Sequence, residues 1–85
     1  MPLTLGLREG DAFCVGDDRF TVSEVVGKFK FKLTRGDGKQ FTVTERFAVE
    51  IADEVFVSAG SHPQNGIARV AIDAPRRLAI YREEP

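Results

Sequence analysis

The sequence predicts a small all-β domain of antiparallel strands with a barrel-like arrangement. Apolar and polar residues alternate with a period of two through most of the chain, which is typical of strands with one buried face. Gly, Asp, Asn and Pro separate these runs, as in tight turns between strands, and helical periodicity is nearly absent. The 85 residues leave room for a single domain, residues 1–85, with a thin core, because small domains bury only about 60% of their unfolded surface.

The first part of the chain predicts three strands. Leu3, Leu5 and Leu7 alternate with polar or small residues, and Gly-Asp pairs at 10–11 and 16–17 mark turns on either side of a short apolar run. Phe20 and Val22 then alternate with Thr and Ser until Gly27 ends the run. We therefore expect a first strand followed by a hairpin.

Residues 28–45 predict a second hairpin. Two alternating runs flank Arg-Gly-Asp-Gly-Lys at 35–39, where the Asp-Gly pair suits the positive φ angles of a tight turn. The expected strand places basic residues on one face and apolar residues on the other; the two sets are Lys28, Lys30, Lys32 and Phe29, Phe31, Leu33.

The second half of the chain predicts shorter strands. Residues 47–60 fit either two strands meeting near Ala52 and Asp53 or one helical turn followed by a strand, and we favour the strands. Turn signals at 61–66 precede a strand at 67–72, a turn at 73–75 and a closing strand at 77–83.

Composition restricts the class of protein. The hydrophobic fraction of 42% and the charged fraction of 29% are those of a folded globular chain. No apolar run approaches the roughly 18 residues of a membrane span, and the N-terminal residues become charged too early for a signal peptide, so we expect a cytoplasmic protein with no membrane partner. The net charge of −1 means that nucleic-acid binding requires a local basic patch.

The sequence offers no catalytic or metal-binding set. Cys14 is the only cysteine and His62 the only histidine, so neither a disulfide nor a four-ligand zinc site can be assembled within the chain. Paired acidic residues fall at turns or on opposite faces of strands. We expect no cofactor and no enzymatic activity.

The two ends of the chain carry the most specific motifs. The closing segment GIARVAIDAPRRLAIYREE resembles the signature of the carbon storage regulator family (CsrA/RsmA), a strand, an Asn/Asp-Ala-Pro turn and a strand that ends in Arg-Glu-Glu. The opening LTLGLREGDAFCVGDDRFTVSEV is similar to the start of the same family. Residues 28–64 have no counterpart in its short members and look like an inserted hairpin and strand segment.

The resemblance implies a fold and a function. In this family two subunits interleave their strands into a homodimer, with the first strand of one beside the last strand of the other, and bind GGA-containing loops of mRNA or small RNA to regulate translation. The RNA-binding positions that it implies here are Leu5, Arg8, Ala74, Pro75, Ile80, Tyr81, Arg82 and Glu83. A protein antagonist is a further partner that we consider. The family's C-terminal helix has no counterpart before Pro85, and Leu7 stands at a usually basic position.

Two questions stay open in the sequence. Lys28, Lys30 and Lys32 form either an auxiliary RNA-binding face or a solvated face neutralised by acidic residues of a neighbouring strand. A second reading of the whole chain is a non-catalytic protein-interaction or structural module that uses the inserted hairpin to add a strand from a partner. The loss of a basic residue at Leu7 favours that alternative.

Overall fold

The computed structural model describes residues 3–27, 29–60 and 66–83. Within them the chain forms strands and turns and no helix, which confirms the all-β prediction. The strands are β1 (Leu3–Arg8), β2 (Ala12–Val15), β3 (Asp18–Gly27), β4 (Lys30–Arg35), β5 (Gln40–Thr44), β6 (Val49–Ala52), β7 (Val55–Ala59), β8 (Ile67–Asp73) and β9 (Ile80–Glu83).

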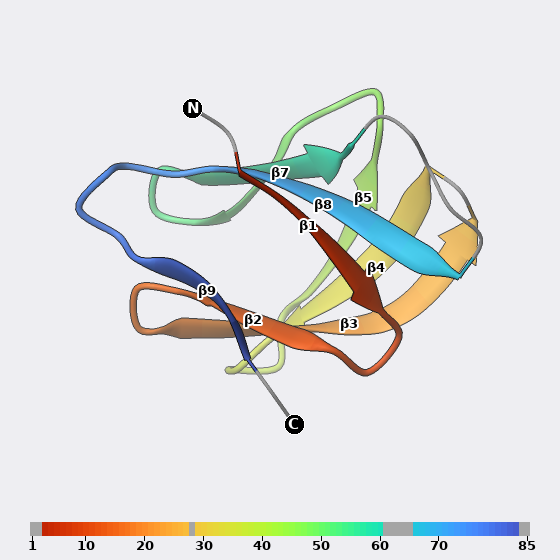
Figure 1. Ribbon diagram of the computed structural model, residues 1–85, viewed down its shortest axis with the longest axis horizontal. Helices are drawn as coiled ribbons and strands as arrows, with labels where there is room; N and C mark the ends of the chain where they lie inside the picture. The colour runs from red at the N-terminus through yellow and green to blue at the C-terminus, as the bar shows by residue number, and fades with distance from the viewer. Residues whose placement is uncertain (1–2, 28, 61–65, 84–85) are drawn as a thin grey trace.

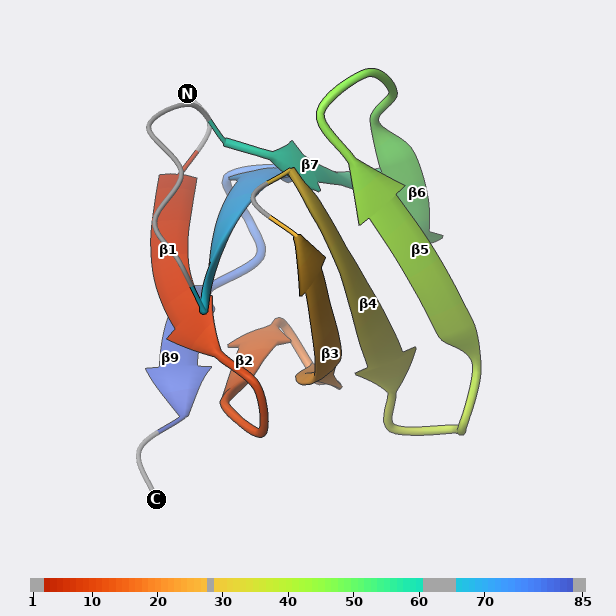
Figure 2. The same cartoon turned by 90° about the vertical axis from the view of Figure 1, so that its right-hand side faces the viewer.

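The strands form two antiparallel sheets packed face to face (Figure 1). Sheet A has the order β1-β8-β7-β6, and sheet B has the order β5-β4-β3-β2-β9. In Figure 2, β5 and β6 lie together on one side of the molecule, and β1 lies above β9 on the other. On the side of β5 and β6, the Arg35 guanidinium of β4 donates a hydrogen bond of 3.0 Å to the Ile51 carbonyl of β6. This hydrogen bond links the two sheets.

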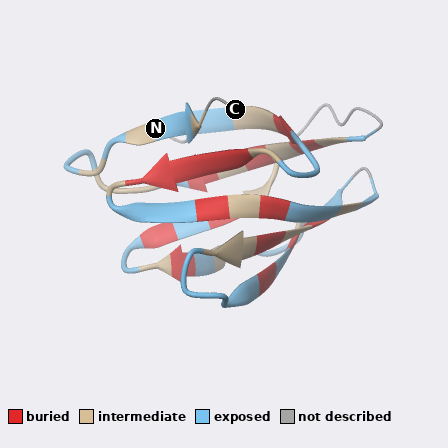
Figure 3. Ribbon diagram, turned by 90° about the horizontal axis from the view of Figure 1, so that it is seen from below, coloured by how far each residue is buried: buried red, intermediate tan, exposed pale blue. Residues whose placement is uncertain are grey.

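The core lies between the sheets, where the inward-facing member of each alternating pair is buried, as the red bands of Figure 3 show. The Phe13 and Phe20 rings stack with their centroids 5.3 Å apart. Residues 29–60 supply a large part of this core, namely Phe31, Leu33, Phe41, Val43, Ile51, Val55 and Val57. The segment without a counterpart in short family members is therefore built into both sheets of this chain.

Two predicted turns are present in the structure. In the β4–β5 hairpin the Arg35 N–H donates to the Lys39 carbonyl at 2.8 Å, and Gly38 takes a φ of 96° that suits glycine. Residues 47–60 form β6 and β7, which meet at Asp53 and Glu54 and exclude the helical alternative. The predicted turn at 61–66 falls largely outside the described residues.

Two boundaries differ from the sequence-based expectation. β4 begins at Lys30, so Phe29 lies in the preceding turn with 39% of its surface exposed and does not join Phe31 and Leu33 in the core. The closing strand begins at Ile80 rather than Arg77, because the Leu78 N–H donates to the Pro75 carbonyl at 3.0 Å and extends the turn. Alternation alone cannot locate these boundaries, since both turn segments continue the strand pattern.

Candidate functional site

β1 and β9 are end strands of their sheets, and their free edges lie on the same side of the molecule (Figure 2). β1 pairs with β8 through the register Leu3–Ile72 to Arg8–Ile67, and β9 pairs with β2 through Val15–Ile80 to Ala12–Glu83. We call the region formed by Leu3–Arg8 and Ile80–Glu83 the β1–β9 edge. It contains most of the residues implicated by the sequence resemblance.

Arg82 joins the two strands of this edge. Its register partner on β2 is Phe13, which is fully buried, so the Arg82 side chain starts on the inner side of sheet B. From there its guanidinium donates a hydrogen bond to the main-chain carbonyl of Gly6 on β1. A guanidinium carries five N–H donors in a planar fork, and no second hydrogen bond from Arg82 to another described residue is present.

Main-chain groups of β1 face the free edge. The register partner of Gly6 on β8 is Arg69, whose carbonyl accepts from the Gly60 N–H at 2.7 Å on the side away from β1. The alternation of an antiparallel ladder therefore turns the main-chain groups of Thr4 and Gly6 away from β8. The Arg8 main chain is occupied locally, because its N–H donates to Asp11 Oδ2 at 3.0 Å and its carbonyl accepts from the Asp11 N–H at 2.9 Å. Thr4 and Gly6 therefore present the open part of the edge, which side-chain motifs in the sequence did not indicate.

Leu5 and Ile80 support the edge from inside. Both are partly buried and pack against the core cluster. Leu7, at the position that is usually basic in the resembling family, is fully buried. Its side chain faces the core, so it offers no contact to a phosphate.

Tyr81 and Glu83 lie on the opposite, outer face of β9. Tyr81 has 52% of its surface exposed and is the register partner of Cys14. The Glu83 carboxylate accepts a hydrogen bond of 2.7 Å from Arg19 Nε and lies 3.8 Å from the Cys14 thiol. The Arg19 hydrogen bond lowers the pKa of Glu83, so this carboxylate is ionised and already paired at neutral pH. The neighbouring Cys14 thiol raises the pKa of Tyr81.

The remaining residues implied by the resemblance lie at the two ends of the edge. Arg8 is exposed at the end of β1 that pairs with Ile67. Ala74 and Pro75 follow Asp73, near the opposite end of the β1–β8 ladder, where Leu3 pairs with Ile72. Within one chain Arg82 thus reaches β1 at Gly6, next to Leu5, whereas Ala74 and Pro75 lie toward the opposite end of β1 from Arg8.

The predicted basic face of β4 is partly neutralised. Lys30 is exposed at the start of β4 and Lys32 follows on the same face of the strand, while Lys28 lies outside the described residues. Lys32 Nζ lies 3.3 Å from Glu24 on β3. The ion pair agrees with the expectation that a neighbouring strand supplies an acidic partner.

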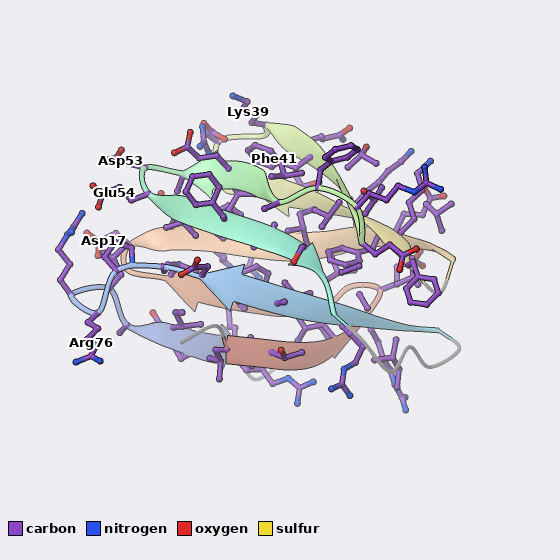
Figure 4. All side chains as sticks on the ribbon, turned by 90° about the horizontal axis from the view of Figure 1, so that it is seen from above. Asp17, Lys39, Phe41, Asp53, Glu54 and Arg76 are labelled. Atoms are coloured by element: carbon purple, nitrogen blue, oxygen red, sulfur yellow. The ribbon has the colours of Figure 1, made fainter. Side chains whose placement is uncertain are left out.

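The arginines of the β8–β9 connection do not form an isolated basic patch. Arg77 forms an ion pair of 2.8 Å with Glu54, and Figure 4 places Arg76 at the same end of the molecule as Asp17, Asp53 and Glu54. Arg69 lies on β8, and its buried Nε has no hydrogen-bond partner among the described residues. These arginines therefore lie on different parts of the surface.

An open polar pocket of about 510 Å³ lies beside the β2–β3 and β4–β5 turns, lined by Asp17, Asp18, Arg19, Arg35, Gly36 and Asp37. The Arg35 guanidinium binds the Asp37 carboxylate at 2.7 and 3.0 Å, and this hydrogen bonding lowers the Asp37 pKa to about 2. The charges that line the pocket are thus already paired in part. Across residues 3–27, 29–60 and 66–83, no group of three or more His, Cys, Asp or Glu side chains is arranged to hold a metal ion.

No protein-family model matches the chain, and no curated protein or solved structure is detectably similar to it. The resemblance of its two ends to the carbon storage regulator family therefore rests on the motifs quoted above. No helix long and apolar enough to cross a membrane occurs in the part of the chain that the structure describes.

Proposed function

We propose that this protein binds single-stranded RNA loops at the β1–β9 edge. The observation that carries the proposal is the Arg82 side chain, which crosses from β9 to the Gly6 carbonyl of β1. It sets a guanidinium beside main-chain groups of β1 that face away from β8, with the exposed Tyr81 on the same strand as Arg82.

These groups match the chemistry of loop recognition. Sequence-specific RNA binding uses unstacked bases that hydrogen-bond to protein groups and stack on aromatic rings or guanidinium planes. The Thr4 N–H, the Thr4 carbonyl and the Gly6 N–H offer donors and an acceptor, while the Gly6 carbonyl is engaged by Arg82. The Arg82 N–H groups that bond to no other described residue suit guanine O6 and N7 or a phosphate. Arg8 adds a positive charge at one end of the edge.

The family resemblance suggests which RNA the protein binds and what effect binding has in the cell. A carbon storage regulator-like protein would act in the cytoplasm on GGA-containing loops of mRNA or small RNA and regulate translation without a cofactor. The family's homodimer places the first strand of one copy beside the last strand of the other, whereas here the Arg82 contact joins β1 and β9 of one chain. We keep this dimer as part of the proposal, and a solution mass measurement at several protein concentrations tests it.

The proposal is tested by titrating a labelled RNA hairpin that presents GGA in its loop and a second hairpin with a scrambled loop. We expect Arg82→Ala to weaken binding to the GGA hairpin by about 10-fold to 100-fold, the range for one lost bidentate contact. Arg77→Ala is the matched control, because Arg77 is exposed and paired with Glu54 away from the edge. Equal affinity of wild type for both hairpins, or equal losses in the two variants, would contradict the proposal.

Strand addition by a protein partner is the second candidate, favoured by the same open edge. β4, which carries the basic run of the inserted hairpin, is paired on both sides by β3 and β5. A partner strand would therefore join at an end strand such as β5 or β1. Failure of the wild type to bind either hairpin at moderate salt, together with capture of an extended peptide that protects β1 or β5 amides from exchange, would favour this candidate.

A further inference from the structure

Three large apolar side chains are exposed around the end of the β3–β4 and β4–β5 ladders. They are Phe47, with 73% of its surface exposed, Val26 with 49% and Phe29 with 39%. Gly27 pairs with Lys30, and Lys30 pairs with Thr44, so the β3–β4 turn and the end of β5 are neighbours. We call Val26, Phe29, Phe47 and the adjoining Lys30 and Arg46 the aromatic tip.

Local structure explains why these side chains are not buried. The register of β3 shifts between Val25 and Gly27, and such a bulge redirects the side chain of the extra residue, here Val26. Phe29 lies in the turn before β4, and Phe47 lies in the connection from β5 to β6. Single exposed apolar residues are ordinary, but several at one end of a small protein mark an interaction surface.

The charges of the tip select an anionic partner. Lys30 and Arg46 are exposed and form no ion pair with another described residue, whereas Glu45 is the one carboxylate between β5 and β6. The opposite end of the molecule carries Asp17, Asp53 and Glu54 (Figure 4). Exposed rings beside unpaired cations are the combination that binds single-stranded nucleic acid, in which bases stack on rings and phosphates contact the cations.

The outer face of sheet B connects the tip with the β1–β9 edge. Tyr81 lies on this face of β9, at one border of the sheet. Lys32 and Lys30 lie on the same face of β4, on the way to the tip. The whole molecule measures 32 × 26 × 21 Å, so a few nucleotides suffice to span this face.

We infer that the aromatic tip is a second contact for the same RNA strand: nucleotides that flank the bound loop stack on Phe47 and Phe29, and their phosphates lie against Lys30 and Arg46. The inference rests on the proposed RNA-binding function and extends it. The contact favours single-stranded over paired RNA but does not select a base sequence, because every base has a face that can stack on an aromatic ring.

The test compares the GGA hairpin with the same hairpin carrying an unpaired extension of about ten nucleotides, long enough for several stacked bases. The extension is expected to tighten wild-type binding by about tenfold or more, and Phe47→Ala to remove most of that gain while binding the short hairpin like wild type. Phe56→Ala is the matched control, since Phe56 is 40% exposed but lies on β7 of sheet A. Equal unfolding midpoints of wild type and Phe47→Ala verify that the variant is folded.

A salt titration supplies a second readout. Replacing Lys30 and Arg46 together by alanine should reduce the slope of log affinity against log salt for the extended RNA by about 1.4, the value for two single-strand phosphate contacts. The slope for the short hairpin should not change.

The outcomes separate this inference from the function on which it rests. A short hairpin that binds and gains nothing from the extension overturns the tip contact and leaves the edge site standing. If neither hairpin binds, the edge site fails, and binding of an unstructured oligouridine that is lost in Phe47→Ala would still support the tip. If neither hairpin binds and oligouridine does not bind either, the tip contact is overturned as well. Binding of the wild type to anionic lipid vesicles but to no RNA also overturns the tip contact.

Discussion

At the scale of single residues, the structure shows contacts of the motif residues that their positions in the sequence do not indicate. Arg82 and Tyr81 are adjacent in the chain but lie on opposite faces of β9, and each is held by a different neighbour. Glu83, which the resemblance implicates in RNA binding, is already paired with Arg19. Strand alternation can be read from the sequence, whereas these partners come from strands more than sixty positions away and cannot.

Asp37 gives a prediction at this scale. Its pKa in the folded protein is lowered to about 2 from 3.8, first by the Arg35 hydrogen bond, so it contributes stability above pH 4 that is lost as the pH falls toward 2. Asp37→Asn should therefore be less stable than wild type at pH 6, and the difference should shrink on acidification. Urea unfolding of both proteins between pH 6 and pH 2 measures it. A difference that stays constant over this range would show that the carboxylate charge does not matter.

At the scale of elements, the turns fix where β9 begins. The Gly16 N–H donates to the Ala79 carbonyl at 2.8 Å, and Gly16 has a φ of 60°. A Cβ at this position would lie 3.0 Å from Leu78 Cδ2, which is closer than ordinary contact. Glycine at 16 thus permits both the turn conformation and the approach of the β8–β9 connection.

Gly16→Ala tests this arrangement. The left-handed conformation alone costs a non-glycine residue roughly 1–2 kcal/mol, and crowding against Leu78 should add to that loss. Gly66→Ala is the matched control, because Gly66 also has a positive φ, of 75°, but nothing within 4 Å of an added Cβ. Thermal or urea unfolding should rank Gly16→Ala as the less stable variant. The reverse order would mean that Leu78 does not pack against this turn.

The element scale also shows what alternation can and cannot predict. The hairpin at 28–45 and the paired strands within 47–60 were predictable, since each has an alternating pattern and a turn signal next to it. The pairing of β1 with β8 and of β9 with β2 was not, because any strand with one apolar face fits beside several others. Phe29 was misplaced because the strand pattern continues through the turn that contains it.

At the scale of the whole molecule, residues 29–60 share one core with the other described strands. Leu33 from that segment and Leu7 from the opening strand are both fully buried. Leu33→Ala and Leu7→Ala should each lower the free energy of unfolding by about 2–5 kcal/mol, as expected for a truncated core leucine. Leu3→Ala, at a position that is 42% exposed, should have a much smaller effect. If Leu33→Ala were as mild as Leu3→Ala, the segment would be a separable insertion.

The candidate site also depends on the whole molecule, because β1 of sheet A and β9 of sheet B must lie close together to form it. The sequence named Arg82 through a family resemblance, but the Gly6 carbonyl and the open main chain of Thr4 become visible only once β1 and β9 are in place. The exposed tip was likewise hidden, since Phe29 and Phe47 look like core residues in the sequence. The sequence shows that Phe29 and Phe47 are aromatic, but it does not show that their side chains are exposed.

The most direct test of the proposed RNA-binding site at the β1–β9 edge is an amide chemical-shift map of the labelled protein titrated with the GGA hairpin. The account predicts the largest changes at Thr4, Gly6, Tyr81 and Arg82, with little change on β6 and on the outer face of β7. Changes centred on β6 and β7, or no change at RNA concentrations that saturate a micromolar site, would contradict it.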